Sequence, residues 1–183
     1  MIVEVRYKPF RWWWLEDVLN GELLGWINKQ EAKSIALDSR RASTNSERTW
    51  INRGPVARHF DKTETRKLFE DITGVNFDNA RTRIELCNDY ADKIQLDPHI
   101  DIKEKLLTLQ IYLKGDPWSG TDLYADPKDP PVTRVPFDRN CAWLVVDQDN
   151  TWHGLESREV RTPRESLIVN YVIGDWKDEE QLV

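Results

Sequence analysis

After Gly74 the sequence consists mainly of short runs of β-branched and aromatic residues, each bounded by Gly, Pro, Asp or Asn. Such runs are typical of strands, and the residues between them are typical of turns. Six strands are predicted in this way: TRIEL (82–86), LLTLQIYL (106–113), TDLY (121–124), TRVPF (133–137), CAWLVVD (141–147) and SLIVNYVI (166–173). Because no helical pattern separates them, they predict an antiparallel sandwich, a jelly roll or a small barrel.

Two of these strands alternate between apolar and polar side chains. In the strand at 106–113, one face holds Leu107, Leu109, Ile111 and Leu113, and the other holds Thr108, Gln110 and Tyr112. In the last strand, one face holds Leu167, Val169, Tyr171 and Ile173, and the other holds Arg164, Ser166, Ile168 and Asn170. Successive side chains of a strand point to opposite faces, so we expect one face to pack into a core and the other to face a polar region.

The first third of the chain, about residues 1–78, is predicted to be helical. One helix is expected in ELLGWINKQEAKSIALDS, after Asn20-Gly21, where Leu23, Leu24, Ile27, Ile35 and Ala36 recur at helical intervals. A second helix has Thr63 as a candidate N-terminal cap, Leu68, Phe69 and Ile72 on one face, and Gly74 as its stop. Together with a β core over about 80–175, we interpret residues 1–183 as one domain.

Charge and cysteine content limit the function classes. The formal net charge of −6 argues against general attraction to nucleic acid. Cys87 and Cys141 are not spaced as a zinc or thioredoxin-like motif, and two lone thiols suit a reducing compartment, although one disulfide stays open. Charged residues interrupt the first fourteen positions, and no later stretch has the length of a membrane span. We therefore expect a cytoplasmic protein that does not bind membranes.

Residues 39–59 form an Arg-rich segment within this acidic chain. It contains Glu47 as its single acid and five arginines, Arg40, Arg41, Arg48, Arg53 and Arg58. A charge run usually forms a solvated loop, and the alternative is a patch for an anionic substrate or partner. Nine tryptophans, with Trp12, Trp13 and Trp14 in a row, are expected mainly to fill the core, and some to line a cleft.

Two of the three histidines stand in a pattern that fits a metal site. His99 and Asp101, in LDPHIDIKEK, project to the same face if the segment is extended. His153, which follows the strand CAWLVVD, supplies a third ligand. Two histidines and one carboxylate leave open positions on a six-coordinate ion, which is the facial triad of non-heme Fe(II) oxygenases. His59, in the Arg-rich segment, is expected to take no part.

In this order the motifs resemble those of the 2-oxoglutarate and Fe(II)-dependent dioxygenases, especially their prolyl-hydroxylase-like branch. The resemblance rests on H-I-D, Q-I-Y-L, G-T-D-L-Y, W-H-G-L and R-E-S-L. It covers about residues 80–175 and extends more loosely to PFRWWWLEDVLNGELLGWI, which is similar to the opening strand and helix of such enzymes. The resemblance implies a mainly β (α+β) fold, a double-stranded β-helix with N-terminal helices packed on it.

The resemblance also implies roles for six residues. His99, Asp101 and His153 would bind Fe(II), and Arg164, helped by Ser166 and Tyr112, would bind the distal carboxylate of 2-oxoglutarate. The chemistry agrees, because Arg164 and Ser166 share a strand face and a guanidinium fork suits a carboxylate. The implied reaction uses O2 to hydroxylate an unactivated C–H bond of an amino acid, a peptide or a protein side chain, with succinate and CO2 as co-products.

Two other functions stay open. The same chemistry could demethylate a nucleobase, which requires a base-flipping pocket and a positive face that the net charge disfavours. A cupin-like metal-binding sensor would have no need of a carboxylate clamp. The sequence also departs from its relatives, with Ser119, Gly120, Thr121 and Asp122 where G-G-E-L or G-G-E-T is frequent. The primary substrate, the position oxidised and the oligomeric state are therefore not specified.

Overall fold

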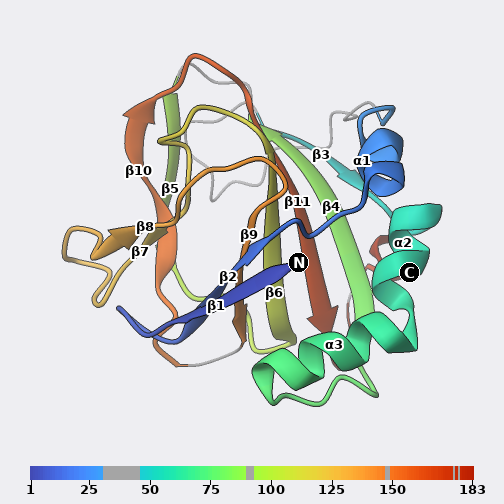
Figure 1. The fold of residues 1–183 in the computed structure, drawn as a ribbon. Helices are drawn as coiled ribbons and strands as arrows, with labels where there is room; N and C mark the ends of the chain where they lie inside the picture. Colours follow the sequence, from blue (N-terminus) through green and yellow to red (C-terminus); the bar gives the residue numbers. More distant parts are fainter. Residues whose placement is uncertain (31–45, 90–92, 147–148, 175, 177) are drawn as a thin grey trace.

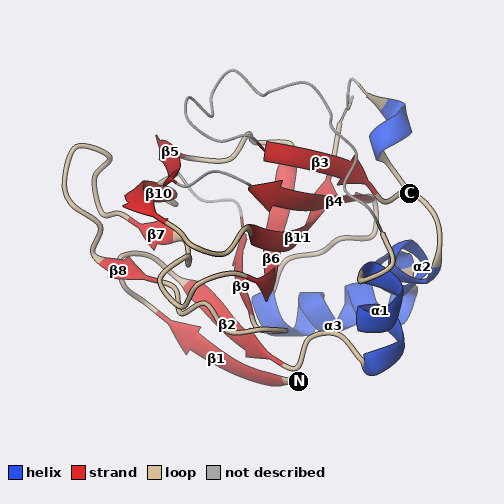
Figure 2. Ribbon diagram, turned by 90° about the horizontal axis from the view of Figure 1, so that it is seen from above, coloured by secondary structure: helices blue, strands red, loops and turns tan. Residues whose placement is uncertain are grey.

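A computed structural model describes residues 1–183 except 31–45, 90–92, 147–148, 175 and 177. The described residues form two antiparallel sheets, three α-helices and a short 3-10 helix, η1 (Glu179–Gln181). Figures 1 and 2 show the helices against the larger sheet, on the side turned away from the smaller one. The predicted mainly β jelly roll with N-terminal helices packed on it is confirmed.

The sheets bring together strands that are far apart in the sequence. The larger sheet has the order β1 (Ile2–Arg6), β2 (Trp12–Glu16), β9 (Ala142–Val146), β6 (Lys105–Lys114), β11 (Arg164–Val172), β4 (Arg81–Asp89) and β3 (Ser46–Trp50). The smaller sheet has the order β5 (Lys93–His99), β10 (His153–Glu159), β7 (Asp122–Leu123) and β8 (Thr133–Arg134). All six predicted strands are present, although β7 and β8 are shorter than predicted.

The N-terminal third is not only helical, and the prediction for it is corrected. It holds β1, β2 and β3 in addition to α1 (Gly21–Ile27), α2 (Pro55–Asp61) and α3 (Thr63–Thr73). The first predicted helix is present as α1, and its continuation from residue 31 lies outside the described residues. The Arg-rich segment is not simply a loop, because its described part contains β3, which pairs with β4, and most of α2.

Helix α3 matches the second predicted helix but differs in two details. Lys62 occupies the N-cap position without a side-chain hydrogen bond, so Thr63 is not the cap. The buried residues are Thr65, Phe69 and Thr73, which are spaced by one turn, and this stripe leaves Leu68 43% exposed. The helix ends at Gly74 as predicted, with φ of 79°, a left-handed conformation that glycine adopts without a steric penalty.

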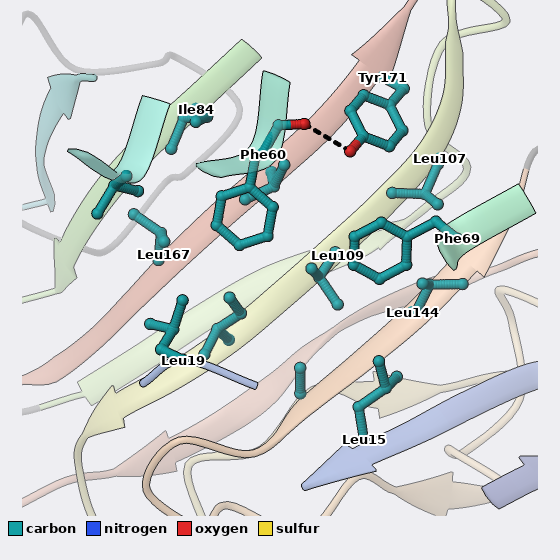
Figure 3. Close-up of a cluster of buried hydrophobic side chains, with 14 of the residues drawn as sticks. Leu15, Leu19, Phe60, Phe69, Ile84, Leu107, Leu109, Leu144, Leu167 and Tyr171 are labelled. Atoms are coloured by element: carbon teal, nitrogen blue, oxygen red, sulfur yellow. Dashed lines mark hydrogen bonds between the residues drawn. The ribbon is translucent and has the colours of Figure 1, made fainter. Parts of the chain in front are cut away.

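The main core lies on the face of the larger sheet that packs against the helices. Leu107, Leu109 and Ile111 of β6 and Leu167, Val169 and Tyr171 of β11 are fully buried, as the alternation predicted. Only Ile173, which follows the end of β11, departs from the pattern, at 37% exposed. Figure 3 shows Phe60 of α2 and Phe69 of α3 packed over these strands, with the Tyr171 hydroxyl donating to the Phe60 carbonyl oxygen at 2.8 Å.

Tryptophan side chains fill both layers of the core. Trp13 points into the core between the larger sheet and the helices. Its neighbours Trp12 and Trp14 point into a second cluster, whose members are Phe10, Trp12, Trp14, Tyr112, Leu123, Val135, Phe137, Trp143 and Val145. This second cluster contains side chains from both sheets and fills part of the space between them. Because successive side chains of β2 point to opposite faces, this one strand contributes tryptophans to both cores.

Cys87 and Cys141 are not joined in a disulfide. None of the described helices has both the length and the apolar character needed to cross a membrane.

Tyr171→Phe tests the link between α2 and the larger sheet. The change removes the donor to the Phe60 carbonyl and keeps the aromatic ring, so we expect the free energy of unfolding to fall by about 1 to 3 kcal/mol. Denaturant unfolding measures this loss. The control is Leu68→Ala on exposed α3 surface, with an expected change within about 0.5 kcal/mol. Equal effects of the two changes would contradict a structural role for this hydrogen bond.

Candidate metal and cosubstrate site

A cavity of about 550 Å³ is lined by residues of both sheets. The larger sheet supplies polar side chains from the inner faces of its central strands, namely Arg83, Glu85, Thr108, Gln110 and Arg164, together with Ile168. The smaller sheet supplies the end of β5 and the start of β10. The polar faces predicted for β6 and β11 therefore contribute directly to a cavity, which has the size of a small-molecule site.

Three of the predicted site residues meet in this cavity. His99 is the last residue of β5 and His153 the first of β10, and the two are direct partners in the antiparallel pair. Asp101 follows β5 by two residues. One ligand atom from each of His99, Asp101 and His153 lies within 4.8 Å of the others. His59 lies on α2 and is not part of this group.

Gly154 allows β10 to approach β5 closely enough for this pairing. A Cβ atom at Gly154 would lie 2.5 Å from the carbonyl oxygen of Leu96 and 3.1 Å from that of Asp97. Both distances are to backbone atoms, which cannot rotate away. The glycine of W-H-G-L is thus required by the local backbone geometry, next to the histidine that it helps to position.

A backbone carbonyl oxygen orients the ring of each of the two histidines. Nδ1 of His99 lies 3.0 Å from the Asp97 carbonyl oxygen, and Nδ1 of His153 lies 2.9 Å from that of Thr151. A carbonyl oxygen only accepts, so Nδ1 carries a proton in each pair, and in a neutral ring the lone pair is then on Nε2. Burial lowers the pKa of His153 to about 4, although Asp101 opposes this shift. His153 is therefore neutral at neutral pH, the form that binds metals.

Asp101 is held as a carboxylate. Its two oxygens accept hydrogen bonds of 2.6 Å from Lys105 Nζ and from Thr108 Oγ1. Burial alone would raise the pKa of Asp101, but the charge of Lys105, these two hydrogen bonds and, in the acidic range where it is protonated, His153 lower it well below its ordinary value. One anionic oxygen thus stands beside two imidazole rings, of which that of His153 is neutral at neutral pH. This donor set fits a divalent ion such as Fe(II).

Arg164 lines the same cavity. Its side chain is buried and donates from Nε to the Ser119 carbonyl oxygen at 2.8 Å and from Nη1 to Asp89 at 3.2 Å. A third, longer contact of 3.5 Å joins Nη2 to Thr121 Oγ1. A guanidinium has five N–H groups, so two remain, one on each Nη nitrogen. This arrangement fits one more carboxylate.

The two other arginines that follow His153 are placed differently. Arg158 donates to the buried carboxylate of Asp122 and to the Gly120 carbonyl oxygen. Arg161 lies in the turn before β11, where its backbone N–H donates to Asp116. Among the described residues of 158–164, Arg164 is the one that lines the cavity.

Ser166 and Tyr112 lie behind the cavity wall. The Ser166 hydroxyl accepts a hydrogen bond of 3.1 Å from Gln110 Nε2. The Tyr112 hydroxyl donates to Thr121 Oγ1 at 3.0 Å, and burial raises the pKa of this tyrosine. Neither residue is among the described residues that line the cavity. The structure thus brings Arg164 to the cavity surface but leaves its two predicted helpers in the layer beneath.

Two residues that sequence reasoning did not select occupy that surface. Gln110 Oε1 accepts from Trp143 Nε1 at 2.9 Å and from Thr121 Oγ1 at 2.8 Å. Both Gln110 and Thr121 line the cavity, and Thr121 Oγ1 lies 3.5 Å from Arg164 Nη2. The position of Gln110 between Thr108 and Tyr112 on one strand face was a sequence signal for it. Thr121 stands in the G-T-D-L-Y motif, but its place in the cavity depends on how the adjacent strand β7 pairs.

Comparison with solved structures identifies the fold. A viral collagen prolyl hydroxylase from Paramecium bursaria Chlorella virus-1, in complex with 2-oxoglutarate, has a TM-score of 0.61 at 17% identity, covering 91% of this chain and 96% of that chain. A Pseudomonas putida prolyl-4-hydroxylase has a TM-score of 0.59 at 14% identity, covering 90% of this chain and 93% of that chain.

A third similar structure is a Trichoplax adhaerens prolyl hydroxylase in complex with a peptide fragment of the hypoxia inducible factor oxygen degradation domain. It has a TM-score of 0.62 at 14% identity and covers 88% of this chain and 83% of that chain. No protein-family model and no curated protein matches the sequence. At these identities the likeness shows that this chain has the fold of prolyl-hydroxylase-like 2-oxoglutarate oxygenases.

Proposed function

We propose that this protein is an Fe(II)- and 2-oxoglutarate-dependent dioxygenase that hydroxylates a C–H bond of an amino acid, a peptide or a protein side chain. The observation that carries the proposal is the joint presence, in one cavity, of the His99, Asp101 and His153 group and of the buried guanidinium of Arg164. A metal-binding sensor would not need the Arg164 guanidinium, because it binds no cosubstrate carboxylate. The described residues would then act as one oxygenase domain.

Each residue of the site has a definite part in this proposal. His99, Asp101 and His153 would hold Fe(II), and Arg164 would bind the distal carboxylate of 2-oxoglutarate through its two remaining N–H groups. Ser166 would fix the Gln110 side chain and Tyr112 the Thr121 side chain, each through one hydrogen bond. The bound iron and 2-oxoglutarate supply the oxidising chemistry with O2. The protein supplies position and a cavity that limits access of water.

The substrate class is part of the same proposal. The Trichoplax enzyme binds a peptide fragment, which supports a peptide among the candidate substrates. The cavity itself has room for a small molecule beside the cosubstrate. Within the described residues no observation favours a nucleobase, and Arg40 and Arg41 of the Arg-rich segment lie outside them.

Anaerobic calorimetry with Fe(II) and 2-oxoglutarate tests the proposal, followed by measurement of succinate after O2 is admitted. We expect 2-oxoglutarate to bind only when a metal is present, because chelation by the ion and the contact with Arg164 act together. Slow succinate formation without a primary substrate is also expected. Absence of metal-dependent 2-oxoglutarate binding would favour a non-catalytic metal-binding protein instead.

A further inference from the structure

A second arginine faces the cavity at the end remote from Arg164. On β11, Arg164 and Asn170 are six residues apart, which corresponds to about 20 Å of strand. Asn170 pairs directly with Arg83 of β4, and both Arg83 and Arg164 line the cavity. One guanidinium therefore lies toward each end of the cavity, and the proposed cosubstrate contact uses only one of them.

Arg83 is held rigidly. Its guanidinium carbon lies 4.3 Å from the ring centre of Trp50 and 5.2 Å from that of Trp176. At its edge, Nε donates to Gln181 at 3.0 Å, Nη1 to Asn170 at 2.9 Å and Nη2 to Glu85 at 2.5 Å. Aromatic rings on a guanidinium and hydrogen bonds around its edge fix its orientation before any ligand arrives.

Two N–H groups of Arg83 remain after these contacts. A guanidinium has five, and three are donated within the described residues, which leaves one on each Nη nitrogen. The residue is only 7% exposed, so bulk water satisfies these donors poorly. A buried donor without an acceptor is costly, and a pair of donors on the two Nη nitrogens suits the two oxygens of a carboxylate.

Hydrogen bonds connect Arg83 to the metal group and fix its place relative to it. Asn170 accepts from Arg83 and donates from Nδ2 to Thr108 Oγ1 at 2.8 Å. Thr108 in turn donates to Asp101 at 2.6 Å. Asn170 of β11 pairs with Arg83 of β4 on one side and with Thr108 of β6 on the other. The backbones of Arg83 and Thr108 are therefore two strand spacings apart, which is about 10 Å. A molecule of amino-acid size is enough to span this interval.

The charge of the cavity favours an anion at this end. Among the described residues, four basic side chains line it, Arg48, Arg83, Lys105 and Arg164, and three acidic ones, Glu85, Asp97 and Asp101. The chain as a whole has a net charge of −6, so the lining has the opposite balance. Lys105 is paired with Asp101, and Arg48 and Arg83 share the single carboxylate of Glu85. Two guanidinium groups of the described residues thus contact one carboxylate at this end.

We propose that Arg83 binds a free carboxylate of the primary substrate, so that the enzyme acts on an amino acid or on the C-terminal residue of a peptide. This inference rests on the proposed function. It assigns the two arginines to two different carboxylates, Arg164 to that of 2-oxoglutarate and Arg83 to that of the substrate. The Arg48 side chain, 17% exposed and bonded to Glu85, completes the positive surface.

Binding measurements with matched acids and amides test this proposal. The probes are the proteinogenic L-amino acids, glycyl dipeptides of the same residues, and the carboxamide of each. Calorimetry and melting temperature are recorded anaerobically on the protein loaded with Fe(II) and 2-oxoglutarate. We expect at least one free acid to bind about 30-fold or more tightly than its amide. Preference for a free amino acid or for a dipeptide then distinguishes the two sources of the carboxylate.

Variants of Arg83 decide whether this residue is responsible. Arg83→Gln should abolish the preference for acids, and Arg83→Lys, which keeps the charge beside Glu85, should retain part of it. The matched control is Arg81→Gln, two residues earlier on β4, where the arginine pairs with Glu179 at the surface. The affinities for Fe(II) and for 2-oxoglutarate should be unchanged in Arg83→Gln, Arg83→Lys and Arg81→Gln.

Three outcomes would overturn the proposal: no acid binds more tightly than its amide, the preference survives in Arg83→Gln, or Arg83→Gln loses 2-oxoglutarate itself. If Arg83→Gln does not fold, a wild-type preference for acids in Arg83→Lys counts against the proposal and a weakened one supports it. The proposed function has a separate criterion, metal-dependent 2-oxoglutarate binding by the unmodified protein. A protein that passes this criterion but shows no acid preference retains the function and loses only this inference.

Discussion

His153→Ala is expected to abolish tight Fe(II) binding. His153 is buried, neutral at neutral pH, and oriented by the Thr151 carbonyl oxygen so that Nε2 is available. Loss of groups that merely orient a metal ligand typically costs about 10- to 100-fold in affinity, so loss of a ligand should cost at least about 100-fold. Anaerobic titration with Fe(II) measures the change. His99→Ala and Asp101→Ala are expected to behave in the same way.

His59→Ala is the matched control. This third histidine of the chain lies on α2, where its ring contacts Phe60, and is not part of the metal group. Its variant should bind Fe(II) like the unmodified protein. Because deletion of a buried ring can also destabilise the fold, the melting temperature of each metal-free variant should be recorded. A folded His153→Ala protein with unchanged Fe(II) affinity would eliminate the triad.

All three members of the metal group were predicted from sequence, but only the local pair could be placed by strand geometry. His99 and Asp101 are two residues apart in an extended segment, so their common direction follows from strand geometry. His153 is 54 residues from His99, and its position opposite His99 depends on the register between β10 and β5. Neither strand was predicted, because KIQLDPH and HGLESRE contain few β-branched residues and include Pro98 and Gly154.

The second arginine of the cavity was missed for a different reason. Arg83 and Glu85 alternate with apolar residues in TRIEL, a pattern that ordinarily places charged residues in solvent. In the structure the same face is turned toward the other sheet, and both side chains are buried. Only the way the jelly roll closes determines which face of a strand is covered. Alternation separates the two faces of a strand, as it did for β6 and β11. It does not tell whether the polar face is covered by a second sheet, and so it could not reveal the burial of Arg83.

Arg164→Ala is expected to weaken 2-oxoglutarate binding by about 2 to 5 kcal/mol, the usual cost of removing one partner of a buried charge pair. This corresponds to a loss of roughly tens to thousands of fold in affinity. The expectation depends on the two N–H groups that Arg164 retains beyond its contacts with Ser119, Asp89 and Thr121. Calorimetry with 2-oxoglutarate on the metal-loaded protein measures the loss. Arg158→Ala and Arg161→Ala should retain the affinity, because neither side chain is among the described residues that line the cavity.

Asp89 complicates the interpretation of Arg164→Ala, because the change also takes one partner from a buried carboxylate and could destabilise the fold. Arg164→Lys separates the two effects. A lysine keeps a positive charge beside Asp89 but presents no guanidinium fork, so folding should be retained while 2-oxoglutarate binds more weakly than in the unmodified protein. If Arg161→Ala loses the cosubstrate and a folded Arg164→Ala keeps it, the assignment of the clamp to Arg164 is wrong, and the supporting role of Ser166 is lost with it.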